Sequence, residues 1–297
     1  MNSSKILSEI FNSAKQIPID NSTKIVLMSD CHRGDGSWAD AFSKNKNTFY
    51  AALNQYYKSG FTYIELGDGD ELWATKHMSN IVGAYKDIFR LMSKFYREGR
   101  FYSLFGNHDM PKKFEKYVER NFSYYFHPRL KKQIPLFPGI KFYDGIILYN
   151  EESGDKIFLV HGHQGDFKNH RVWRMSSFLF RYFWKPLALF GVNDPTRTAK
   201  NYIEKEKVDR SLRYWIAEKS QMLIAGHTHR PMFPEPDDLH YFNIGSCVHP
   251  RCITAMEIED GKITLVKWSI KTKDDGTLYI ARGIIAGPRK LSKYFSN

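Results

Sequence analysis

The chain has 297 residues, of which 42% are hydrophobic and 15% aromatic, and this is enough for a sizeable buried core in one large domain or two small ones. Its three cysteines are odd in number and show no CxxC spacing, which argues against a disulfide framework and favours a reducing cytoplasm. The net charge of +12 is uneven, with basic segments at residues 76–133, 168–219 and 261–297. Such a surface suits a partner that carries phosphate, such as a nucleic acid, an anionic membrane or a phosphorylated small molecule, and it also suits a merely solubilising role.

The first half of the chain has the pattern of a layered α/β core. Residues 1–17 form an amphipathic pattern that predicts a short helix ended by Pro18. Continuous apolar runs then predict buried strands at residues 24–29, 62–67, 100–106, 145–150, 155–162 and 221–227. Helical spacing of apolar residues separates the first three of these runs. No stretch has the length and uninterrupted apolar character of a membrane-spanning helix.

Two later segments depart from this pattern. Residues 168–219 predict a helical insertion within a single domain of residues 1–297. The last part of this insertion is expected to be a helix with Val208, Leu212 and Trp215 on one face. The aromatic and basic residues near the start of the insertion suit either a lid that packs on its own core or a helix at a membrane surface. After Gly245, two alternating runs around residues 259–261 predict a β-hairpin, and residues 271–297 are expected to be a C-terminal extension.

Polar residues with metal-binding side chains follow five of the predicted strands. They are Asp30, His32, Asp68, Asn107, His108, Asp109, His161, His163, His227 and His229. Each cluster alone is compatible with an ordinary turn, but together they supply ligands for two ions of manganese, iron, zinc or magnesium at the carboxyl ends of strands. Glycines beside them, among them Gly106 and Gly226, allow sharp turns and close approach.

The motifs D-x-H, G-D-x-x-E, G-N-H-D, V-H-G-H and G-H-T-H occur in this order, and over residues 24–270 the chain resembles the calcineurin-like metallophosphoesterases. The resemblance implies a four-layer α-β-β-α sandwich of mixed sheets with a helical lid. It implies that Asp30, His32 and His229 hold one metal. It also implies that Asn107, His161 and His227 hold a second, with Asp68 bridging the two.

The same resemblance implies the chemistry. A hydroxide held between two divalent ions, with manganese favoured over iron, zinc or magnesium, would attack phosphorus in line. His108 would stabilise the transition state or protonate the leaving oxygen, and Asp109 would orient its ring. His161 is preferred over His163 as the ligand because the first histidine of this motif is the ligand in the family.

The surrounding residues bear on the substrate. Trp73, Arg230 and the predicted insertion resemble the branch of the family that contains UDP-2,3-diacylglucosamine hydrolase, which favours an amphiphilic, lipid-linked substrate and a cytoplasmic protein that associates with the inner face of a membrane. Expected substrate contacts are Arg33, His163, Arg171, Arg174 and Arg230. A nucleotide or nucleic-acid phosphodiesterase is the alternative enzyme, and a scaffold without activity is the alternative outside enzymes. A thiol nucleophile at Cys31 is disfavoured because adjacent side chains on an extended segment point in opposite directions.

Overall fold

The computed structural model describes residues 3–127, 130–165 and 202–295. The described helices are α1 (Ser3–Ser13), α2 (Lys46–Lys58), α3 (Met78–Ala84), α4 (Lys86–Arg97), α5 (Glu115–Phe122) and α8 (Tyr202–Lys219). Short 3₁₀ turns lie at Ala41–Asn45, Met110–Lys113, His163–Gly165 and Leu291–Lys293. Among the helices so described, none is long and apolar enough to cross a membrane.

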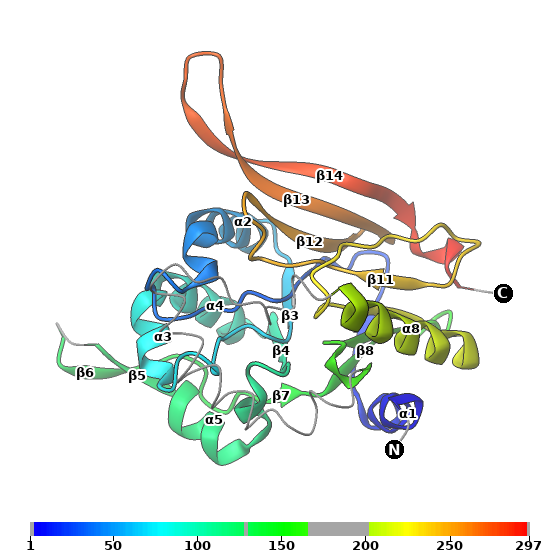
Figure 1. Cartoon of the computed structure of the whole chain (residues 1–297), viewed down its shortest axis with the longest axis horizontal. Coiled ribbons are helices and arrows are strands. Elements are labelled where there is room, and N and C mark those ends of the chain that lie inside the picture. The colour runs from blue at the N-terminus through cyan, green and yellow to red at the C-terminus, as the bar shows by residue number, and fades with distance from the viewer. Residues whose placement is uncertain (1–2, 128–129, 166–201, 296–297) are drawn as a thin grey trace.

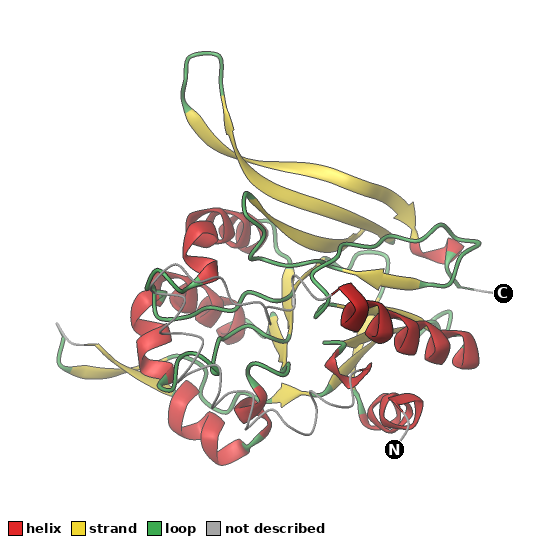
Figure 2. Ribbon diagram, viewed as in Figure 1, coloured by secondary structure: helices red, strands yellow, loops and turns green. Residues whose placement is uncertain are grey.

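Most of the described strands form two large mixed sheets (Figures 1 and 2). The seven-stranded sheet has the order β14 (Leu278–Lys290), β13 (Lys262–Thr272), β12 (Cys252–Glu259), β2 (Ile25–Met28), β3 (Thr62–Leu66), β4 (Phe101–Leu104) and β7 (Phe142–Tyr143). The five-stranded sheet has the order β1 (Lys15–Ile19), β8 (Gly145–Asn150), β9 (Lys156–Val160), β10 (Met222–Ala225) and β11 (Tyr241–Asn243). A separate hairpin consists of β5 (Tyr124–His127) and β6 (Lys132–Pro135).

Three apolar cores separate four layers. The central core joins the facing sides of the two large sheets, and Ile25 and Leu27 of β2 contribute to it. The alternate residues Val26 and Met28 of the same strand pack instead against the core beneath α2 and α4. A third core lies between the five-stranded sheet and helices α1 and α8. The central strands, such as β2, β3, β9 and β10, are thus buried on both faces, which explains their continuous apolar runs, and the layers confirm the predicted α-β-β-α sandwich.

The predicted N-terminal helix is wrong in its length. Helix α1 ends at Ser13, and Lys15–Ile19 form strand β1, which pairs in parallel with β8 and includes Pro18. Strand β1 lies at the edge of its sheet, so Pro18 can face away from the ladder without costing it a hydrogen bond.

The hairpin predicted near residues 259–261 is confirmed by the antiparallel pairing of β12 with β13, in which Glu259 lies opposite Lys262. The C-terminal residues then form β14, which pairs along β13 and extends the seven-stranded sheet at its edge. Figure 1 shows the hairpin of β13 and β14 projecting from the body of the molecule. Residues 168–201 of the expected insertion lie outside the described residues, whereas Val208, Leu212 and Trp215 of α8 lie buried in the third core, as predicted.

Packing of α8 rests on Trp215, which is 1% exposed and has Phe11 of α1 and Phe158 of β9 as aromatic neighbours. We expect Trp215→Ala to lower the free energy of unfolding by about 3–5 kcal/mol, because it leaves a large cavity. The adjacent Tyr214 is 64% exposed, so Tyr214→Ala is the matched control and should change stability by no more than about 0.5 kcal/mol. Denaturant unfolding measures both, and equal effects would contradict this docking of α8.

Candidate metal centre

The predicted ligands lie on loops that directly follow strands β2, β3, β4, β9 and β10. The loops after β2 and β3 continue the pairing of their strands beyond the strand ends. Backbone N–H groups of Asp30, His32 and Arg33 donate to the carbonyl groups of Gly67, Asp68 and Gly69 at 3.2, 2.8 and 3.0 Å, respectively. This ladder sets the spacing between Asp30, His32 and Asp68 before any side-chain contact is considered.

Five of the predicted ligands have a left-handed backbone, which non-glycine residues rarely adopt. Their φ angles are 54° for Asp30, 47° for His32, 49° for Asp68, 66° for His227 and 56° for His229. Such a conformation costs about 1–3 kcal/mol per residue and persists only where the surrounding structure enforces it. Its concentration in these residues marks the loops as a functional site.

Two glycines allow other loops to approach the ligand carboxylates. A Cβ atom on Gly106 would lie 2.2 Å from Oδ1 of Asp68, and one on Gly226 would lie 2.6 Å from Oδ2 of Asp30. Both distances are far below van der Waals contact, so any larger residue would displace a ligand. The predicted role of these glycines in close approach is therefore confirmed.

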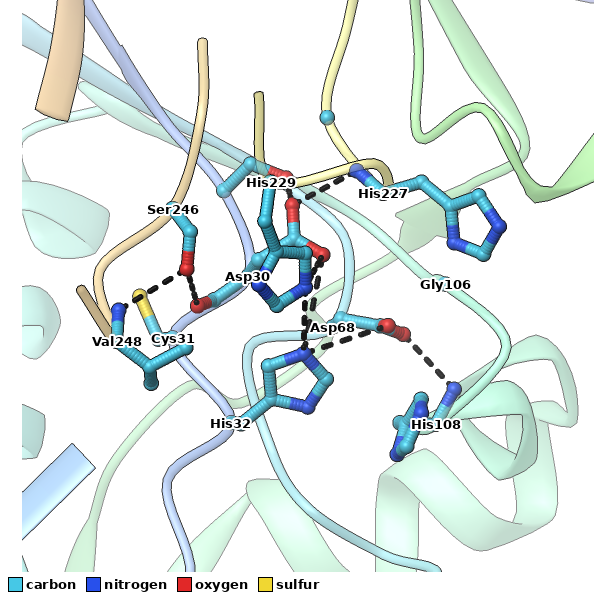
Figure 3. A network of polar contacts seen from close by, with 12 residues as sticks. Asp30, Cys31, His32, Asp68, Gly106, His108, His227, His229, Ser246 and Val248 are labelled. Atoms are coloured by element: carbon cyan, nitrogen blue, oxygen red, sulfur yellow. Dashed lines mark hydrogen bonds and ion pairs between the residues drawn. The ribbon is translucent and has the colours of Figure 1, made fainter. Parts of the chain in front are cut away.

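The ligand side chains form two groups, each with three ligand atoms within 4.8 Å of one another. The first comprises Asp30, His32 and His229, and the second comprises Asp68, His161 and His227. Oδ2 of Asp68 lies between the groups, 3.3 Å from Nε2 of His161 and 3.8 Å from Nε2 of His32. Figure 3 shows Asp30, His32 and Asp68 with their side chains directed toward a common centre. The arrangement is that of two adjacent metal sites that share one carboxylate.

The polar atoms of these residues fit metal ions. Oδ1 of Asp30, Oδ1 of Asn107 and Nε2 of His161 are buried and have no hydrogen-bond partner among the described residues. Nε2 of His229 is 3.1 Å from Oδ1 of Asp30 but is not in line for a hydrogen bond. Buried polar atoms nearly always have a partner, and this set of carboxylate, amide and imidazole groups suits divalent ions.

The electrostatics of the centre point the same way. Burial opposes the charge on Asp30 and Asp68, yet neighbouring imidazoles, chiefly His229 and His161, hold the pKa of both carboxyl groups well below the usual value. Burial also opposes the charge on His161, but Asp68 and Asp30 raise its pKa to about 9. Burial and the nearby His161 lower the pKa of His227 to about 3. The two carboxylates therefore remain ionised in the interior, where cations stabilise them.

Hydrogen bonds on the far side of two rings orient their nitrogens. Nδ1 of His161 lies 2.7 Å from the carbonyl oxygen of Leu66, and Nδ1 of His32 lies 3.1 Å from Oε2 of Glu71. When Nδ1 donates a proton to these acceptors, Nε2 keeps its lone pair for the centre.

The predicted role of Asp109 in orienting His108 does not match the structure. Nδ1 of His108 lies 2.9 Å from Oε1 of Glu71, so Glu71 bonds the rings of both His108 and His32. Burial opposes the charge on Glu71, but His108 holds its pKa below the usual value. Oδ1 of Asp109 instead accepts from the backbone N–H of Gly106 at 2.6 Å, and Oδ2 accepts from that of Gly69 at 3.0 Å. Asp109 thus fastens two loops together.

The sequence analysis did not identify Glu71 as a functional residue, and it did not predict that Trp73 contacts His108. The E of the G-D-x-x-E motif was the available signal for Glu71. Trp73 stacks on His108 with 3.9 Å between ring centroids and 20° between planes, and its Nε1 donates to the carbonyl oxygen of Asn107 at 2.8 Å. Glu71 and Trp73 together fix both the edge and the face of the His108 ring.

Arg33 was predicted to contact substrate, but the structure places it in the interior. It is fully buried, and its guanidinium group donates to both carboxylate oxygens of Glu65 at 2.6 and 2.9 Å and to Asp70 at 2.9 Å. Nζ of Lys112 lies 2.8 Å from Asp70 and 2.6 Å from Asp109. These five residues, here called the buried ion network, support the loops from behind.

The remaining predicted contacts lie in different environments. His163 is buried, with its ring centroid 5.5 Å from that of His161, but it belongs to neither of the two ligand groups. Arg230 is half-buried beside His229, and Arg171 and Arg174 lie outside the described residues. Cys31 is buried, and Figure 3 shows its sulfur away from the ring of His32, as expected.

Comparison with known proteins agrees with this geometry. Residues 23–231 match the calcineurin-like phosphoesterase family, whereas no curated protein matches the chain.

Solved structures similar to the chain include Vps29 from Cryptosporidium parvum and from Chaetomium thermophilum. The identities are 15% and 11%, the alignments cover 90% of this chain and 100% and 97% of the other chains, and the TM-scores are 0.40 and 0.37. A putative 5′-nucleotidase from Staphylococcus aureus is 10% identical, with coverage of 93% and 56% and a TM-score of 0.36.

The two ligand groups predict the metal content of variants. We expect the protein loaded with excess Mn²⁺ to retain two ions per chain and His161→Ala to retain one, because the second group loses a ligand. His163→Ala is the matched control and should retain two. Elemental analysis after gel filtration measures this, and loss of an ion from His163→Ala alone would reverse the assignment of the two histidines.

The buried ion network predicts a large stability effect. We expect Arg33→Met to lower the free energy of unfolding by about 3–5 kcal/mol, because Glu65 and Asp70 remain buried without their partner. Lys24 forms a 2.7 Å ion pair with Glu259 at the surface, so Lys24→Met is the control and should cost no more than about 1 kcal/mol. Chemical denaturation followed by circular dichroism compares the two variants, and similar costs would refute a structural role for Arg33.

Proposed function

The chain belongs to the calcineurin-like phosphoesterase family, and we propose that it hydrolyses a phosphoester or pyrophosphate bond with two divalent ions at this centre. The observation that carries the proposal is the shared carboxylate of Asp68 between two groups of buried ligand atoms. Bound there, two ions would neutralise charge on the phosphoryl oxygens and lower the pKa of a water molecule. Asp30, His32 and His229 would hold one ion, and Asn107, His161 and His227 the other.

His108 is the group best placed to act on the substrate itself. Its Nδ1 lies 2.9 Å from Oε1 of Glu71, and the family resemblance implies that Nε2, on the other edge of the ring, donates a proton to a phosphoryl oxygen or to the leaving oxygen. The carboxylate of Glu71 holds the Nδ1 edge of the ring, and the indole of Trp73 prevents the ring from turning. His32 meets the same ring edge to face, with centroids 4.6 Å apart, so the donor lies directly beside the first metal group.

The complete ligand set argues against an inactive scaffold. A fold kept only for binding has no need for five strained ligand residues or for buried carboxylates that require cations. The structure also argues against a thiol nucleophile, because burial raises the pKa of the Cys31 thiol well above its usual value.

We further propose manganese as the native metal and a phosphorylated small molecule or lipid as the substrate. The mixed oxygen and nitrogen ligands suit manganese, and iron, zinc and magnesium are the alternatives. Support for an amphiphilic substrate, and for association with an anionic membrane on its cytoplasmic side, comes from the composition of residues 168–201, where aromatic and basic residues alternate. The excess of basic residues also suits a nucleotide or nucleic acid, so both belong in the substrate panel.

Two substitutions test the proposed roles of His108 and its hydrogen-bond partner Glu71. With Mn²⁺ added, we expect His108→Ala to keep both ions and to lower kcat on an aryl phosphate by about 100- to 10,000-fold, because it removes the proton donor. Glu71→Gln should also lower kcat, and it should leave the metal content unchanged. Glu115→Gln, on the exposed face of α5, is the control for loss of one carboxylate. Full activity of His108→Ala would refute its role, and absence of metal-dependent turnover across the whole panel would refute the enzyme.

A further inference from the structure

Helix α8 has a lysine on its inward face that the proposed chemistry leaves without a role. Lys205 is only 6% exposed, and it lies on the same side of the helix as Val208, Asp209 and Leu212, which are also buried. Among the described residues, Lys205 forms no ion pair. A lysine side chain that is almost wholly buried is costly unless an anion reaches its ammonium group.

A chain of hydrogen bonds attaches this face of α8 to the metal centre. Tyr241 donates from its hydroxyl to Asp209 at 2.7 Å, and Asn243 donates to the same hydroxyl at 3.2 Å. The amide of Asn243 also donates to the carbonyl oxygen of Gly226 at 2.7 Å and to Oγ1 of Thr228 at 3.1 Å. Gly226 and Thr228 belong to the loop that carries His227 and His229. The position of Lys205, one turn before Asp209, is therefore fixed relative to that loop.

Lys205 has two basic side chains near it besides the ligand His229. It lies within electrostatic range of Arg230, His249 and His229, and also of the carboxyl groups of Asp30 and Asp209. Burial, followed by Arg230, lowers its pKa. Nε2 of His249 is buried without a hydrogen-bond partner among the residues described. Lys205, Arg230 and His249 thus lie near His229, a ligand of the first metal group.

We propose that Lys205, together with Arg230 and His249, binds a second anionic group of the substrate, a phosphate or a carboxylate that is not the group hydrolysed. This inference rests on the proposed function, because the reacting phosphoryl group is assigned to the two metals and His108. The substrate class is accordingly a phosphoester or diphosphate with a further anion close to the reacting phosphorus. A phosphate or carboxylate there would pair with the ammonium group of Lys205, for which the described residues supply no ion pair.

Non-hydrolysable probes separate this site from the metals. Methylphosphonate carries one anionic group, methylenediphosphonate carries two phosphonates, and phosphonoacetate carries a phosphonate and a carboxylate. We expect Lys205→Gln in the Mn²⁺-loaded protein to raise the Kd of each probe that carries the matching second group by about 10- to 100-fold, as measured by calorimetry. Its affinity for methylphosphonate should change less than about threefold. The response of one two-group probe and not the other identifies the second group as phosphate or carboxylate.

Control variants test the anion site separately from the proposed hydrolysis. Lys207→Gln, on the exposed face of the same helix, should leave every affinity unchanged, and Lys205→Gln should leave Tm unchanged or raise it, because no described ion pair is lost. Equal changes for all three probes, no change for any, or a clear drop in Tm would overturn the proposal. If the protein hydrolyses no phosphoester yet still binds a two-group probe through Lys205, the proposed function fails and the anion site stands.

Discussion

Two buried cations hold three buried carboxylates directly behind the metal ligands, and the geometry of the centre depends on this pairing. Arg33 follows His32, Asp70 lies two residues after Asp68, and Asp109 lies two residues after Asn107. The ligand loops after β2, β3 and β4 are thus each fastened by a buried charge, and such a charge cannot leave its partner without a large cost. We infer that the network makes the spacing of the ligand loops specific, rather than adding greatly to stability.

The same loops carry the strain that the network helps to enforce. Five ligands have a positive φ, which is unfavourable for each of them, and the ladder between the loops after β2 and β3 holds three of them, Asp30, His32 and Asp68, in that conformation. The stability that offsets this strain comes from elsewhere, mainly from the apolar core between the two large sheets. This separation is physically reasonable, because the centre is polar and contributes little hydrophobic burial of its own. The ligand loops therefore keep their strained conformation because they are anchored to rigid sheets.

The sequence was informative where a single local property decides the structure. Continuous apolar runs identified the strands because both faces of each strand are buried, and the order of polar clusters identified the ligands because strand ends gather at one edge. It failed where a partner distant in sequence decides. The partners of Arg33 lie 32 and 37 residues away, and Glu71, rather than the adjacent Asp109, meets the ring of His108. The extent of β1 likewise depended on its position at a sheet edge, which no local pattern around Pro18 reveals.

Exposure divides the centre into a buried side and an open side. Asp30, Asp68 and His161 are at most 2% exposed, whereas the side chains of His32, His108 and His229 are 11–16% exposed. Among the described ligands and His108, these three rings are therefore the ones most accessible from solvent, and Lys205, Arg230 and His249 lie near His229. The metal ligands are fixed by strand ends and can tolerate little variation, whereas α8 is joined to them through a few hydrogen bonds at Asp209 and Tyr241. Residues of α8 and its neighbours can therefore change without moving a ligand, which is why we place the proposed second anion site there.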